Sequence, residues 1–170
     1  DASGKGTPTI GPLEPTVGDV LTCEKGIWSG NPTYGYQWMR EGVAITGATA
    51  VTYTTTTADD VKSLTCVVTA TNSGGSAKAT SNAVVPKMKT PVNDDRAVNG
   101  KPTIGPLAPT VGDVLTCDKG IWSGNPAYGY QWMREGVAIV GATAVTYTTT
   151  TADDLKSLTC VVTATNSGGS

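Results

Sequence analysis

Any chemistry in this sequence depends on cysteines and carboxylates, because its 170 residues include no histidine. The four cysteines fall into two pairs, Cys23 with Cys66 and Cys117 with Cys160, and the members of each pair are 43 residues apart. A zinc site needs ligands at short spacing, which neither pair offers. We therefore predict one disulfide per pair, a bond that persists outside the cytosol. Two buried reduced thiols, packed as small apolar side chains, are the alternative.

The paired carboxylates do not form an acid–base site by themselves. Asp59-Asp60 and Asp94-Asp95 are adjacent pairs, and neighbouring residues of an extended segment point to opposite sides. The usual nucleophile–base triads also lack a histidine. We therefore predict no enzyme activity, no catalytic residue, no cofactor and no metal site. Calcium held by Asn93, Asp94 and Asp95 is the alternative to a solvated hinge there, although their spacing matches no calcium loop.

Short alternating strands surround each cysteine pair. Cys23 ends the alternating run 20–23, Trp38 follows it by 15 residues, and Cys66 lies in a later alternating run, 64–71. In a two-sheet sandwich, this order places a tryptophan beside a disulfide that joins the two layers. An edge strand at 8–13, a strand at 51–57 and a last strand at 76–85 are also expected. Because no segment has a helical period over three turns, the fold class is all-β.

The whole arrangement occurs twice. Residues 101–170 repeat residues 7–76 without a gap, so Cys117, Trp132 and Cys160 recur at an offset of 94. Six of the 70 aligned positions differ: Thr7/Lys101, Glu14/Ala108, Glu24/Asp118, Thr33/Ala127, Thr46/Val140 and Val61/Leu155. We predict domain 1 at 7–85, a proline-containing linker at 86–100 and domain 2 at 101–170. The second domain lacks a copy of the last strand, so either the chain continues or another molecule supplies a strand.

Composition excludes two classes of partner. The formal net charge is -2 and no basic run occurs, whereas nucleic-acid binding requires clustered Lys and Arg. No apolar run approaches the roughly 20 residues that a membrane helix requires. We therefore expect neither nucleic-acid binding nor membrane insertion.

Motifs throughout both modules resemble immunoglobulin-like (Ig-like) domains, and more closely the tandem Ig-like modules of bacterial surface proteins and tailed-phage virion proteins. In the first module these motifs are Gly18–Cys23, Gly26–Pro32, Tyr36–Gly42, Ile45–Ala48, Tyr53-Thr54, Ala58–Asp60 and Val68–Ser76. The resemblance implies two tandem Ig-like β-sandwiches, each with one inter-sheet disulfide. Antibody-type domains carry a tyrosine two residues before the second cysteine. Leu64 and Leu158 stand there instead, which favours the microbial variety, while Asp60 occupies the acidic position before Cys66.

Aromatic residues mark the surface that we predict to make contacts. Trp28 and Tyr34 lie in and just after the glycine-rich loop that follows the first cysteine, and Trp122 and Tyr128 repeat them. Aromatic side chains on sandwich loops can stack on the faces of sugars, so we predict a weak glycan or host-surface contact here. The alternative is that Trp28 folds over the end of the core.

These features together favour a non-enzymatic structural and adhesive module. We expect it to be extracellular or exposed on a virion surface, as part of a phage tail or head appendage, acting as a spacer and weak host-surface binder. Its partners would be a host cell-surface glycan or protein and other virion subunits, with avidity from tandem display. A secreted bacterial adhesin or extracellular filament subunit, with strand completion by a neighbouring subunit, is the alternative.

Overall fold

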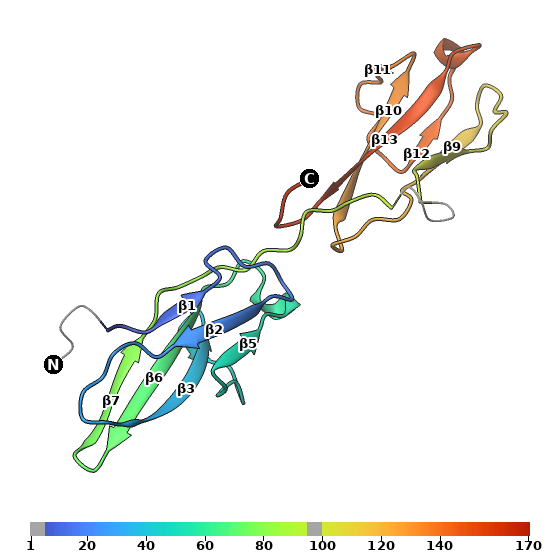
Figure 1. Ribbon diagram of the computed structural model, residues 1–170. Helices are drawn as coiled ribbons and strands as arrows, with labels where there is room; N and C mark the ends of the chain where they lie inside the picture. Colours follow the sequence, from blue (N-terminus) through green and yellow to red (C-terminus); the bar gives the residue numbers. More distant parts are fainter. Residues whose placement is uncertain (1–5, 95–99) are drawn as a thin grey trace. The chain divides into compact units, whose positions relative to one another are not determined.

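The computed structural model describes residues 6–94 and 100–170. The chain divides into two compact units, Asp1–Lys89 (unit 1) and Thr90–Ser170 (unit 2) (Figure 1). The candidate calcium ligand Asp95 lies outside the described residues, as do positions 96–99 of the predicted linker. No helix in the described ranges has the length and apolar character needed to cross a bilayer.

Unit 1 consists of two antiparallel sheets. One sheet has the strand order β1-β2-β5, and the other has the order β4-β3-β6-β7. Strands β2 and β6 alternate buried and more exposed residues, as expected when one face of each sheet covers a core. The strands and the 3-10 turn η1 are β1 (Thr9–Gly11), β2 (Val20–Glu24), β3 (Thr33–Arg40), β4 (Val43–Ala44), β5 (Thr52–Thr54), η1 (Thr57–Asp59), β6 (Leu64–Asn72) and β7 (Gly75–Thr80).

A disulfide and a tryptophan form the centre of unit 1. Cys23 of β2 and Cys66 of β6 join the two sheets, with their Cα atoms 6.3 Å apart. Trp38 of β3 lies directly opposite Cys66, and its ring packs on Tyr53 of β5 with the centroids 5.6 Å apart. Since Tyr53 belongs to the other sheet, the aromatic pair also spans the two layers. The inter-sheet disulfide predicted from cysteine spacing is present.

Unit 2 repeats this architecture around the Cys117–Cys160 disulfide and Trp132. Its sheets have the strand orders β12-β9-β8 and β11-β10-β13. Its elements are β8 (Thr103–Gly105), β9 (Val114–Asp118), β10 (Ala127–Arg134), β11 (Val137–Ala138), β12 (Thr146–Thr148), η2 (Thr151–Asp153) and β13 (Leu158–Thr165). The protein is therefore all-β, with two tandem Ig-like sandwiches, as predicted.

One strand distinguishes the two units. In unit 1, β6 pairs with β3 on one side and with β7 on the other. Its counterpart β13 pairs with β10, and no strand of the described residues pairs along its second side. One edge of this sheet is consequently open in unit 2.

The segment 86–94, predicted as linker, makes hydrogen bonds within each unit. In unit 1, the carbonyl oxygen of Lys87 accepts a hydrogen bond from the Val17 amide at 2.8 Å. In unit 2, the carbonyl oxygen of Val92 accepts one from the Ser123 amide at 3.0 Å. Residues on the two sides of the boundary are thus held by the unit to which they belong.

Candidate interaction surfaces

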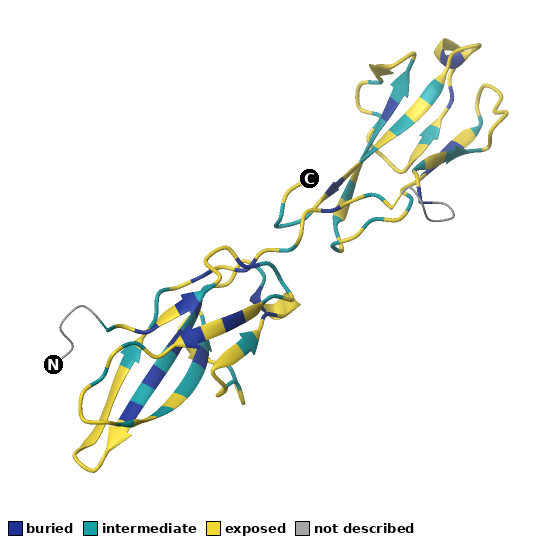
Figure 2. Cartoon of the chain, viewed as in Figure 1, coloured by how far each residue is buried: buried dark blue, intermediate teal, exposed yellow. Residues whose placement is uncertain are grey.

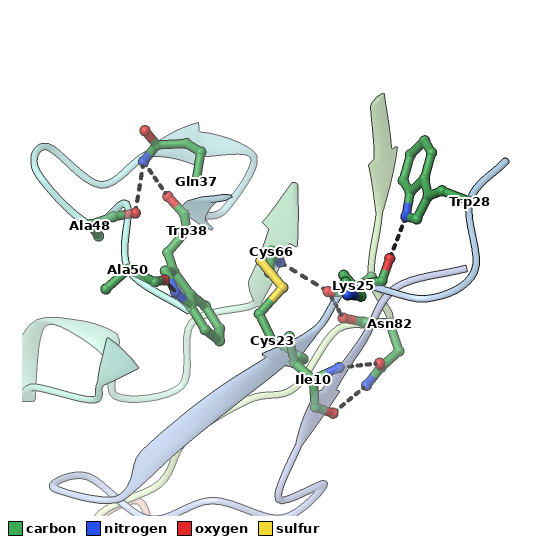
Figure 3. Close-up of a disulfide and its surroundings, with 11 residues drawn as sticks. Ile10, Cys23, Lys25, Trp28, Gln37, Trp38, Ala48, Ala50, Cys66 and Asn82 are labelled. Carbon is green, nitrogen blue, oxygen red and sulfur yellow. Dashed lines mark hydrogen bonds between the residues drawn. A yellow bond between two sulfur atoms is a disulfide. The ribbon is translucent and has the colours of Figure 1, made fainter. Parts of the chain in front are cut away.

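The disulfide and tryptophan of unit 1 belong to the interior. The exposed fraction is 1% for Cys23 and 0% for Cys66 and Trp38. The indole N–H of Trp38 donates a hydrogen bond to the carbonyl oxygen of Ala50 at 2.9 Å, so its polar atom is used within the fold (Figure 3). All four cysteines of the chain are disulfide-bonded. This constellation therefore stabilises the scaffold and offers no reactive group.

The buried carboxylate at the turn η1 is Asp59. The resemblance to Ig-like domains instead places the acidic residue at Asp60. Asp59 is 0% exposed and ends η1. Its Oδ1 accepts a hydrogen bond from Arg40 Nε at 2.7 Å and forms an ion pair with Arg40 Nη2, also at 2.7 Å. Its Oδ2 accepts a hydrogen bond from the Tyr53 hydroxyl at 2.9 Å. Asp60 follows the turn, and its Oδ1 accepts the Met88 amide at 3.2 Å. Adjacent carboxylates thus have separate structural roles.

Hydrogen bonds keep Asp59 and its counterpart Asp153 ionised. Burial by itself would raise the pKa of Asp59, but donors on Arg40, Thr56 and Tyr53 outweigh burial and lower the pKa. In unit 2, burial is again opposed by donors, and the pKa of Asp153 falls from 3.8 to about 2. A carboxylate with so low a pKa accepts protons poorly near neutral pH. The cluster is suited to holding the corner together rather than to general-base chemistry.

The predicted aromatic surface of unit 1 comprises Trp28 of the loop between β2 and β3 and Tyr34 at the start of β3. Trp28 and Tyr34 are half-buried, meet edge to face with ring centroids 6.5 Å apart, and pack against the core. The Trp28 indole N–H donates to the carbonyl oxygen of Lys25 at 2.6 Å, and the Lys25 ammonium lies 4.6 Å from the Tyr34 ring centroid. The sequence therefore predicted two residues that meet in space. Lys25 covers one face of Tyr34, which leaves less aromatic surface for a ligand.

The copy of this surface in unit 2 has an additional neighbour. The Trp122 indole N–H donates to the carbonyl oxygen of Lys119 at 2.6 Å, and the Lys119 ammonium lies 4.2 Å from the Tyr128 ring centroid. Asn93 forms an isolated antiparallel bridge with Trp122. Since this part of the chain borders the second loop, the two aromatic surfaces have different surroundings despite their shared sequence.

Asn93, in the predicted linker and at the start of unit 2, uses its side-chain amide within the fold. The Asn93 side-chain nitrogen donates to the carbonyl oxygens of Gly100 at 2.7 Å and Ile121 at 3.1 Å. Among residues 6–94 and 100–170, no group of three or more His, Cys, Asp or Glu side chains is placed to hold a metal ion.

The open edge of unit 2 leaves part of its core uncovered. Leu64 and Cys66 of β6 are 0% exposed, whereas their counterparts Leu158 and Cys160 are half-buried. Figure 2 shows buried dark-blue bands along β6 and mainly teal and yellow bands along β13. Residues 64–71 and 158–165 have the same sequence. Different surroundings, rather than different side chains, therefore account for the contrast.

A groove of about 540 Å³ adjoins this edge. Its apolar lining includes Ile104, Leu115 and Leu158, and also Leu155, whose exposed fraction is 97%. The sequence repeat predicted an unpaired edge but not this groove. Residues 101–170 repeat residues 7–76, so positions equivalent to 77–88 are not among the described residues.

Comparisons with known proteins provide little further information. No family model and no curated protein matches the chain. Among solved structures, a chimeric titin Z1Z2-Z1Z2 tandem functionalized with an exogenous GRGDS peptide from fibronectin is 18% identical, covers 95% of this chain and 93% of its own, and has a TM-score of 0.28. A TM-score this low supports no argument. The fold assignment rests on the strand orders, disulfides and core tryptophans described above.

Proposed function

We propose that this protein is a non-enzymatic structural and interaction module that works outside the cell. The observation that carries the proposal is the disulfide through the core of each sandwich, because such bonds persist in oxidising compartments. Each unit supplies a stable body, and two of them in tandem form a spacer. The carboxylates of the corner clusters serve the fold, in keeping with a role other than catalysis.

The setting that we propose is a virion surface, with the chain in a tail or head appendage. Support comes from motifs such as Gly26–Pro32 and Tyr36–Gly42, which resemble those of tailed-phage Ig-like modules. In this role the loop at Trp28 would make weak contacts with a host glycan or protein, and the loop at Trp122 would add avidity. Other virion subunits would hold the spacer in place.

A second candidate function follows from the open edge of β13. Unpaired backbone groups along an edge are a template for strand addition. The alternative that we propose is a secreted bacterial adhesin or an extracellular filament subunit in which a neighbouring subunit adds a strand to this edge. Sedimentation over a range of concentrations tests the candidate: assembly supports it, and a monomer at high concentration contradicts it.

Single-molecule stretching of the chain from its two ends tests the spacer role. We expect two unfolding events, and each should lengthen on reduction, because a disulfide withholds from extension the segment between its cysteines, whose sequence separation is 43. At about 3.5 Å per residue, the added length is roughly 150 Å per unit. Equal lengths with and without reductant would contradict a spacer reinforced in this way.

Host-surface contact is tested separately with Trp28→Ala and Trp122→Ala on glycan arrays and host cells. Loss of binding by folded Trp variants supports the proposed contact. Ile27→Ala is the matched control, since Ile27 belongs to the same loop and is 78% exposed. A wild-type chain that binds neither surface would remove the adhesive role and leave the spacer.

A further inference from the structure

We propose that Lys25, Trp28 and Tyr34 of unit 1 form a site for a negatively charged sugar. The sugar ring stacks on the Trp28 indole, and its anionic group pairs with the Lys25 ammonium. The inference names the ligand class of the host-surface contact proposed above, and it rests on that proposal for its biological setting.

The loop after β2 brings an ammonium group and two aromatic rings together. The Trp28 indole N–H donates to the Lys25 carbonyl oxygen at 2.6 Å, so the two residues belong to one turn (Figure 3). The Lys25 ammonium lies 4.6 Å from the Tyr34 ring centroid, within the range of a cation–π contact. Trp28 meets the same ring edge to face. Since Lys25 and Trp28 both lie against Tyr34, one small ligand can contact both.

The positive charge of Lys25 is available to a ligand. The ion pairs among residues 6–94 and 100–170 belong to Arg40 and Arg134, so the Lys25 ammonium has no carboxylate partner there. Lys25 is exposed, and a cation–π contact at an exposed site is weak. An anionic group that a ligand brings would therefore gain a charge-assisted hydrogen bond without first breaking an ion pair.

This charge favours acidic sugars over neutral ones. A neutral sugar that stacks on Trp28 would displace water from the neighbouring ammonium and return no charge to it, which costs free energy. A sugar that carries a carboxylate or a phosphate offers the same apolar ring face together with a partner for Lys25. The site is consequently suited to anionic sugars as a class.

One substitution favours unit 1 over unit 2. The arrangement recurs around Lys119, but Asp118 precedes that lysine where unit 1 has Glu24. The Oδ1 of Asp118 accepts the Gly120 amide at 2.8 Å, which holds its negative charge at the loop. The longer Glu24 side chain instead lines a groove with Leu13. Because a carboxylate at the loop repels a bound anion, we expect weaker binding in unit 2.

NMR titration of the full 170-residue chain tests the site, with the indole N–H signals of Trp28 and Trp122 as separate probes of the two units. The ligands are a trimer of galacturonic acid, its methyl ester and mannose 6-phosphate. We expect the Trp28 signal to shift saturably with the acid trimer. The methyl ester keeps the rings but loses the charge, so it should bind about tenfold more weakly. Mannose 6-phosphate shows whether phosphate serves as well as carboxylate.

Substitution of the lysine separates charge recognition from stacking. Lys25→Gln should weaken binding of the acid trimer about tenfold and remove its advantage over the ester. Trp28→Ala should weaken both ligands alike. Lys62→Gln is the matched control, because Lys62 is also an exposed lysine of unit 1, and it should bind like wild type.

A reciprocal exchange tests the preference for unit 1. Glu24→Asp should weaken binding at Trp28 about threefold, and Asp118→Glu should strengthen binding at Trp122 by a similar factor, because the exchange moves a carboxylate to or from the loop. A general loss of stability would not move the two sites in opposite directions. Equal binding at the two sites in the wild-type chain would contradict the assignment to unit 1.

Two outcomes would overturn the proposal: no saturable shift with either anionic sugar, or equal binding of the acid trimer and its methyl ester. Neutral glycans that bind through Trp28 would also overturn it, while leaving the host-surface contact in place. Charge-dependent binding by a chain that attaches to no host cell supports the site and removes the host-surface role, so the two proposals fail separately.

Discussion

Asn82 binds both backbone groups of Ile10, although 72 residues separate the two in sequence. Ile10 belongs to β1, whereas Asn82 follows β7 of the other sheet. The last segment of unit 1 therefore ties the two layers together in addition to the Cys23–Cys66 disulfide. The position equivalent to Asn82 lies past residue 170, so among the described residues this interaction is seen in unit 1 alone.

Removing the Asn82–Ile10 hydrogen bonds should lower the stability of unit 1 and leave that of unit 2 unchanged. Asn82→Ala should lower the free energy of unfolding of unit 1 by about 2 kcal/mol, since two hydrogen bonds to partly buried backbone are lost. Calorimetry of the full chain measures the change. Lys78→Ala, on the exposed part of β7, is the control and should remain within about 0.5 kcal/mol of wild type. If both variants unfold like wild type, the contact contributes nothing.

Unit 2 should unfold before unit 1. In the 170-residue chain, Val84 is buried in unit 1 and its equivalent position lies past residue 170, and burying a valine side chain contributes about 2 kcal/mol. Two calorimetric transitions are expected. Leu158→Ala should shift the lower transition, and Leu64→Ala should shift the upper one. A single transition, or the reverse assignment, would contradict this order.

Loss of a disulfide should strongly destabilise the unit that contains it. The loop between Cys23 and Cys66 spans 43 residues, and by loop-closure entropy its cross-link contributes about 4 kcal/mol. The double variant Cys23→Ala/Cys66→Ala should therefore lose about that much in urea unfolding of unit 1. An unchanged melting temperature in reductant would show that the cross-links do not stabilise the fold.

Lowering the pH should remove the stabilisation that Asp59 and Asp153 give to their units. The pKa of Asp153 falls to about 2 from 3.8 on folding, so its stabilisation is present above pH 3.8 and is lost as the pH falls toward 2. Asp153→Asn should reduce the stability of unit 2 at pH 7 by about 3 kcal/mol. The difference from wild type should shrink between pH 4 and 2, as measured by urea midpoints. Glu24→Gln, at an exposed position, should show neither effect; a pH-independent difference for Asp153→Asn would contradict the ion-pair explanation.

The sequence contained enough information to predict the core. Alternation around Cys23 and Cys66 identifies the faces that point inward, and the position of Trp38 between them is typical of a sandwich. The repetition, with six differences in 70 positions, then predicted the second unit. Trp28 and Tyr34 were also correctly expected to lie together, because only five residues separate them.

Other features depend on tertiary geometry that residue patterns do not encode. Asp59 and Asp60 are equally polar, and only the direction of η1 decides which one is buried. Asn82 lies in a Ser-Asn pair typical of a turn, so its contact with a distant strand leaves no local signal. The prolines and charges of 86–94 favour a linker, yet they say nothing about its backbone hydrogen bonds.

Amide hydrogen exchange in β6 and β13 tests most directly whether β6 is paired on both sides while β13 is paired on one side alone. Residues 64–71 and 158–165 have the same sequence, so their intrinsic exchange rates are closely matched. We expect the amides of Leu158 and Cys160 to exchange much faster than those of Leu64 and Cys66, whose N–H groups donate to Val84 and Ser81. Equal protection of the two strands would contradict an open edge in unit 2.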